Sequence, residues 1–101
     1  MSEIATTPKT GTVTRTERPK LHKVILVNDD YTPREFVVIV LKGEFHMSED
    51  QAHKVMMTAH RRGVCVVGVF AGDIAQTKAT RATDAGRARG YPLLFTTEPE
   101  E

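Results

Sequence analysis

Three consecutive residues with oxygen acceptors, Asn28, Asp29 and Asp30, stand between an apolar run and a helix start in the stretch LVNDDYTPREFV. Amide and carboxylate side chains at a chain reversal are typical of a turn, because they accept hydrogen bonds from nearby backbone N–H groups. The same oxygens could also hold a positively charged group. Taken singly, each residue favours the turn.

A further acceptor is His60, near the end of a predicted helix that stops at Gly63. Alone, a histidine at this position would be expected to interact with the last carbonyl groups of its helix. A helix pair that runs down and back, however, brings His60 to the edge that carries the turn. The carbonyl of Asn28, the carboxylate of Asp30 and a neutral His60 ring would then match the three donors of an ammonium group.

Apolar residues accompany these acceptors. Leu26, Val37 and Met56 are expected at the same edge, where they would line a hydrophobic hole. An ammonium group beside a large apolar side chain describes the N-terminus of a peptide that begins with a hydrophobic residue. A small hydrolase that uses His60 and Asp30 is the weaker alternative, since the sequence offers neither a nucleophile nor an oxyanion-stabilising device.

The elements that must position these residues can be predicted from periodicity and capping. LHKVILVN, from Leu21, predicts a strand. Thr32 as N-cap, Pro33 at the first helical position and Glu35 then predict a capping box and a helix to Gly43, apolar on nearly all sides and therefore buried.

A second helix is predicted over residues 48–62, with Ser48 and Gln51 as capping box. Residues 64–71 predict a buried strand. A third helix is predicted to open at Asp73, with Gln76 three residues later, and to run to Gly90. The stretch YPLLFTT predicts the last strand of the domain. The third helix carries a stripe of small residues suited to close packing on a sheet. This stripe consists of Ala75, Ala79, Ala82 and Gly86.

The order strand, helix, helix, strand, helix, strand predicts an α+β fold. With short connections, the second and third strands run opposite to the first, which lies between them. We therefore expect a small three-stranded antiparallel sheet, with strand order 2-1-3, packed against three helices.

Composition limits the remaining functions. The chain has 101 residues and a net charge of +1, which fits one domain and favours neither nucleic acid nor a membrane surface as a partner.

We expect residues 1–20, rich in Thr, Lys and Arg, to form a disordered arm, and residues 21–101 to form the core domain. The four histidines lack metal-ligand spacing, no cofactor motif is present, and Cys65 is expected to be a buried thiol. A cytoplasmic protein without metal or cofactor is the expectation.

The motifs VNDDYTP, MSEDQAHKVMMTAH, GDIAQTK and YPLLFTTE resemble, in order, those of ClpS, the bacterial adaptor that delivers N-degron substrates to the protease ClpAP. The resemblance implies that Asn28, Asp30 and His60 bind the free α-amino group of a substrate that begins with Phe, Leu, Tyr or Trp. It implies that Asp29 shapes the loop and holds the start of the peptide. The implied side-chain pocket consists of Leu26, Thr32, Arg34, Val37, Met56, Ala59 and Leu93. The implied contacts with the N-terminal domain of the unfoldase ClpA are Asp73 and Lys78, and a monomer is expected.

One residue departs from this family pattern. The family usually has Met after the proline of YTP, where this chain has Arg34. The aliphatic stem of Arg34 could still wall the pocket with its guanidinium in water. We therefore expect an altered ligand range or weaker binding of some N-degrons, as in a divergent second ClpS of one organism. The alternative function is an interaction module without an amine site, on a scaffold like that of the ribosomal stalk protein.

Overall fold

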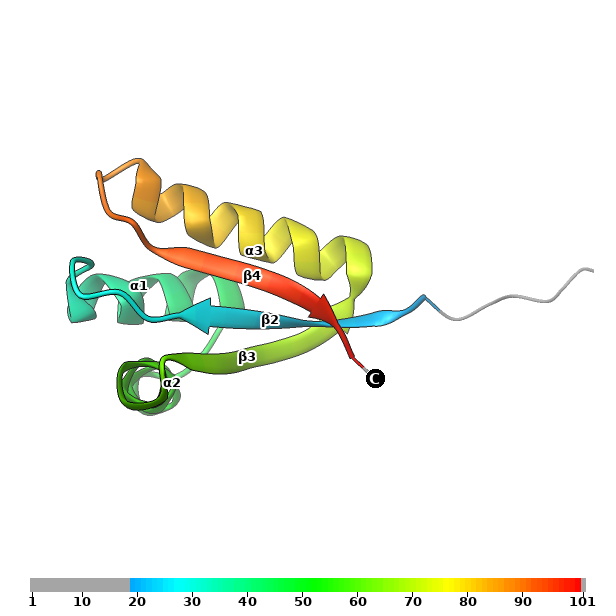
Figure 1. Ribbon diagram of the computed structural model, residues 1–101, viewed down its shortest axis with the longest axis horizontal. Coiled ribbons are helices and arrows are strands. Elements are labelled where there is room, and N and C mark those ends of the chain that lie inside the picture. Colours follow the sequence, from blue (N-terminus) through cyan, green and yellow to red (C-terminus); the bar gives the residue numbers. More distant parts are fainter. Residues whose placement is uncertain (1–18, 101) are drawn as a thin grey trace, which may run out of the picture.

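The computed structural model describes residues 19–100. The elements are β2 (Leu21–Val27), α1 (Arg34–Phe45), α2 (Glu49–Arg62), β3 (Val64–Ala71), α3 (Gly72–Arg87) and β4 (Leu94–Pro99) (Figure 1). The strands form one antiparallel sheet in the order β3-β2-β4, with the first strand in the middle. The predicted α+β class, element order and sheet order are therefore confirmed. The predicted N-terminal arm lies, up to residue 18, outside the described residues.

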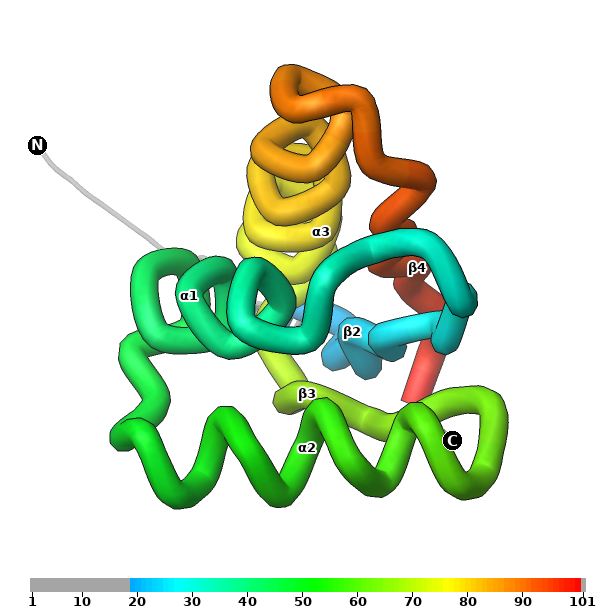
Figure 2. Tube along the Cα trace, turned by 90° about the vertical axis from the view of Figure 1, so that its left-hand side faces the viewer, coloured from blue at the N-terminus to red at the C-terminus, as the bar shows by residue number. Residues whose placement is uncertain are grey.

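Helices α1 and α3 lie on one face of the sheet, and α2 lies across the end of β3 (Figures 1 and 2). Among residues 19–100, no helix covers the face turned toward the viewer in Figure 1. The core lies between the sheet and these helices, and Val24 and Leu41 are fully buried there. The small-residue stripe predicted on α3 is buried throughout. A Cβ atom on Gly86 would lie 2.6 Å from Cβ of Leu93, so only glycine permits this close approach.

Two predictions of complete burial were wrong. Val64, Val66 and Val69 of β3 are exposed, because the helices formed by residues 19–100 leave one face of the sheet open. Cys65, between Val64 and Val66, is half-buried. In α1, Ile39 points to solvent and is 62% exposed, whereas Val37, Val38, Val40 and Leu41 are buried. The apolar sequences of β3 and α1 could not indicate which side of each element would face solvent instead of packing against the core.

Only in α2 does the observed helix cap match the cap predicted from the sequence. The Ser48 hydroxyl accepts a hydrogen bond from the Gln51 N–H at 3.1 Å, and Gly63 ends the helix with φ of 91°. The capping box predicted for α1 was wrong: Pro33 is the N-cap residue, and no side chain caps the helix. Helix α3 begins at Gly72 and ends at Arg87, and it also lacks the predicted side-chain cap.

Candidate functional site

A cavity of about 270 Å³ opens at the end of the domain where the β2–α1 turn meets the last turns of α2. This end faces the viewer in Figure 2. Every residue that the sequence predicted for the amine site and the side-chain pocket lines this cavity. The lining consists of Leu26, Val27, Asn28, Asp29, Asp30, Tyr31, Thr32, Pro33, Arg34, Val37, Met56, Ala59, His60 and Leu93.

The interior of the cavity is apolar and is built from core residues of several elements. Leu26 comes from the central strand, Val37 from α1, Met56 and Ala59 from α2, and Leu93 from the segment that enters β4. All five are at least nine-tenths buried, so their side chains belong to the core as well as to the cavity wall. This wall offers a hydrophobic surface to any side chain that enters.

Polar acceptors stand at the mouth. The backbone N–H of Asn28 donates to the carbonyl of Gly63 at 2.9 Å, which joins the β2–α1 turn to the corner after α2. Asp30 is exposed, and its carboxylate takes part in none of the hydrogen bonds or ion pairs found among residues 19–100. His60 is also exposed, in the last turn of α2. The chain thus presents an amide, a carboxylate and an imidazole above an apolar pocket.

Unlike Asp30, Asp29 is hydrogen-bonded within the β2–α1 turn. Its Oδ1 atom accepts hydrogen bonds from the backbone N–H groups of Tyr31 at 2.8 Å and Thr32 at 2.7 Å. Its Oδ2 atom accepts from the Thr32 hydroxyl at 2.9 Å. The Thr32 hydroxyl, which the sequence had suggested as a helix cap, thus donates to this carboxylate, and Pro33 takes the N-cap position. Three of the roughly four lone pairs of this carboxylate therefore fix the turn.

Arg34 is exposed, as expected for a guanidinium in water, and it also contacts a second residue of the site. Its Nη2 atom lies 3.0 Å from Nε2 of His60. The first residue of α1 is thereby linked to the last turn of α2, across the mouth of the cavity.

The residues that the family resemblance assigned to the unfoldase lie elsewhere. Asp73 and Lys78 are on the first turns of α3, at the end of the domain opposite the β2–α1 turn (Figure 1). Asp73 is exposed. Lys78 is half-buried: its ammonium donates to the carbonyl of Glu44 at 3.0 Å and lies 5.4 Å from the ring centre of Phe70. Lys78 therefore has a structural role in joining α3 to the end of α1.

Three cavity residues were missing from the sequence prediction: Val27, Tyr31 and Pro33. They are the immediate neighbours of predicted site residues, and a turn that wraps around a ligand brings its whole backbone to the cavity. Tyr31 is 81% exposed, which is unusual for an aromatic side chain. Adjacency in the turn was the signal that could have indicated them.

Among residues 19–100, no helix is long and apolar enough to cross a membrane. Within the same range, no group of three or more His, Cys, Asp and Glu side chains is arranged to hold a metal ion.

The fold and the cavity place the chain in a known class of proteins, the adaptors of the ATP-dependent Clp protease. Residues 17–96 match the family model described as "ATP-dependent Clp protease adaptor protein ClpS". The chain belongs to the ClpS family, and it is an adaptor and not an enzyme.

Several relatives are similar over nearly their whole length. The chain is 75% identical over 101 residues to the Clp protease adapter ClpS 2 of Mesorhizobium japonicum and 78% identical over 103 residues to ClpS 1 of Rhodopseudomonas palustris, with all of each chain covered. A solved structure of Agrobacterium tumefaciens ClpS2 bound to L-phenylalaninamide is 66% identical. It aligns with 82% of this chain and 100% of its own, with a TM-score of 0.81.

Proposed function

We propose that this adaptor binds the free α-amino group and the large hydrophobic first side chain of substrate proteins, and that it delivers them to an AAA+ unfoldase of the ClpA type. The observation that carries the proposal is one cavity with a buried apolar interior and with the acceptor side chains of Asn28, Asp30 and His60 at its mouth.

The acceptors fit an ammonium group in number and in charge. The Asn28 carbonyl, the Asp30 carboxylate and Nε2 of a neutral His60 can each accept one of the three ammonium protons. The negative charge of Asp30 makes its hydrogen bond the strongest of the three. Asp29 is already occupied by the turn, so its part in binding is to hold Asn28 and Asp30 in place.

The size of the cavity suits one amino-acid side chain. Its volume of about 270 Å³ lies just below the roughly 300–1000 Å³ of sites for drug-sized ligands. The first side chain (Phe, Leu, Tyr or Trp) would contact Leu26, Val37, Met56 and Leu93. L-phenylalaninamide, the ligand of the similar Agrobacterium protein, combines a free α-amino group with such a side chain.

Delivery would use the opposite end of the domain. Asp73 is exposed at the start of α3, away from the cavity, so an unfoldase bound there would leave the substrate site open (Figure 1). Lys78 would act there mainly by fixing α3 against α1, since its ammonium is already hydrogen-bonded. Replacing Asp73 with Arg should abolish degradation of a Phe-leading reporter by ClpAP while leaving peptide binding intact.

The binding site can be tested by calorimetric titration of the full chain with L-phenylalaninamide and with N-acetyl-L-phenylalaninamide. We expect binding of the free amine and none of the acetylated compound. Asp30→Asn should weaken binding at least about tenfold, because a charge-assisted hydrogen bond is lost. Asp50→Asn, a matched change of an exposed aspartate outside the cavity, should have no effect. Equal binding of both compounds would rule out an amine site.

A further inference from the structure

The contact between Arg34 and His60 fixes the state of the histidine ring. A guanidinium has only donors and stays protonated, so Nη2 of Arg34 can approach Nε2 of His60 at 3.0 Å only if that nitrogen is unprotonated. The ring is then neutral and carries its proton on Nδ1. This is the same tautomer that an incoming ammonium group needs.

The imidazole nitrogen has a single lone pair, which accepts one hydrogen bond. We propose that in the ligand-free adaptor the Arg34 guanidinium occupies this lone pair, as an internal competitor of the substrate α-amine, and that the amine must displace it to bind. This inference rests on the proposed function and adds to it a residue that sets the affinity for every substrate. It differs from a role in shaping the side-chain pocket, because the amine is common to all substrates.

The guanidinium of Arg34 can move into a neighbouring groove when the amine displaces it. Arg34 also borders a second groove of about 470 Å³ between α1 and α2. Arg34 is exposed, so the displaced guanidinium can turn into this groove and donate to water when the amine arrives.

The expected effect is moderate. Both Arg34 and His60 are exposed, so water competes for each partner. If the guanidinium covers His60 for about 70–90% of the time, the amine-accessible fraction falls to about 0.3–0.1, and the apparent Kd rises about threefold to tenfold.

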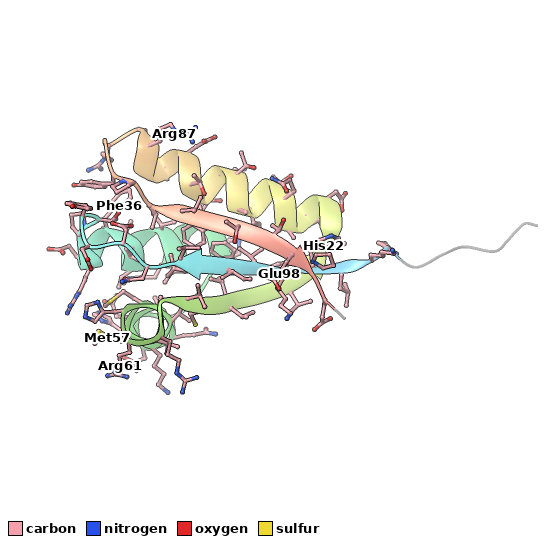
Figure 3. All side chains as sticks on the ribbon, in the orientation of Figure 1. His22, Phe36, Met57, Arg61, Arg87 and Glu98 are labelled. Carbon is pink, nitrogen blue, oxygen red and sulfur yellow. The ribbon has the colours of Figure 1, made fainter. Side chains whose placement is uncertain are left out.

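The test compares Arg34→Met with wild type and with Arg61→Met. Arg61 is exposed on α2, points away from the sheet (Figure 3) and does not line the cavity, so its replacement removes the same charge without touching His60. Titration with L-phenylalaninamide and L-leucinamide should show about threefold to tenfold tighter binding of both ligands by Arg34→Met. Arg61→Met should change either affinity by less than about twofold.

A second measurement reads the ring directly. In ¹⁵N NMR spectra, His60 of the free wild type should show one dominant neutral tautomer with the proton on Nδ1, and Arg34→Met should show a mixture of both tautomers. Unchanged or weaker binding by Arg34→Met, or a gain for only one of the two ligands, would overturn the inference but leave the amine site standing. Failure of both wild type and Arg34→Met to bind either ligand would instead refute the proposed function, and the inference with it.

Discussion

Asp29 and Asp30 are adjacent residues of the same type, and we predict opposite consequences when each is replaced with alanine. The Asp29 carboxylate accepts three hydrogen bonds within the turn, whereas the Asp30 carboxylate is exposed and accepts none from the described residues. Asp29→Ala should therefore lower stability, and Asp30→Ala should lower ligand binding only.

The magnitude follows from the environment of the lost partners. The Tyr31 N–H is exposed and can bind water after the change, so its loss is nearly neutral. Thr32 is only 8% exposed, and its N–H and hydroxyl would lose an ionised acceptor, at a cost of about 1–2 kcal/mol each. Asp29→Ala should thus reduce the free energy of unfolding by about 2–4 kcal/mol, or at least about 8 °C in melting temperature for a domain of this size. Asp30→Ala should change it by less than about 0.5 kcal/mol.

Urea denaturation and thermal melting of both variants would measure these differences, followed by titration with L-phenylalaninamide below the melting temperature. Asp29→Asn is the matched control, since its side-chain oxygen can still accept the two backbone hydrogen bonds; we expect a loss of about 1 kcal/mol. Our reasoning would be refuted if the two alanine variants were equally stable, or if Asp30→Ala bound the ligand like wild type.

Three further predictions follow from the structure. Gly86→Ala should lower the free energy of unfolding by about 1–3 kcal/mol and weaken ligand binding, because the new methyl group would displace Leu93 from the cavity wall. Chemical denaturation and ligand titration would detect these two effects. An unchanged free energy of unfolding and an unchanged Kd would contradict the close approach of Gly86 to Leu93. Burial raises the pKa of the Cys65 thiol, which disfavours the reactive thiolate, so alkylation by iodoacetamide near pH 8 should be several-fold slower than that of a cysteine peptide and equal to it after unfolding. His60→Ala should weaken binding of L-phenylalaninamide several-fold, because the ammonium group loses one acceptor, whereas His60→Gln, whose amide oxygen can accept in its place, should lose less; calorimetric titration would compare the two variants.

Local sequence signals were sufficient to predict the fold and to bring Asn28, Asp30 and His60 to one edge with Leu26, Val37 and Met56. The other predicted cavity residues, Asp29, Thr32, Arg34, Ala59 and Leu93, came from the family resemblance. Capping by Ser48, the stop at Gly63 and the short connections constrain the path of the chain enough to bring His60 beside the turn. Strand order followed from the same short connections. These are local signals, and each depends on residue types that have few alternative conformations.

The wrong predictions concern the exact start of a helix and contacts between residues that are distant in the sequence. The Thr32 hydroxyl was expected to accept from the first turn of α1. Pro33 is the N-cap residue instead, so Thr32 precedes the helix end and its hydroxyl donates to the Asp29 carboxylate. The exposure of Val64 and Val66 depends on which sheet face the helices leave open, and their apolar character is the same in either case. The direction of the Arg34 side chain depends on His60, 26 residues away.

The cavity wall is assembled from residues as far apart in the chain as Leu26 and Leu93. The whole site therefore requires most of the length of the folded domain. Binding is then coupled to folding by mass action: a ligand at one hundred times its Kd stabilises the folded chain by about 2.7 kcal/mol. Under the proposed function, an adaptor with a bound substrate is therefore harder to unfold than an empty one while it is held beside an unfoldase.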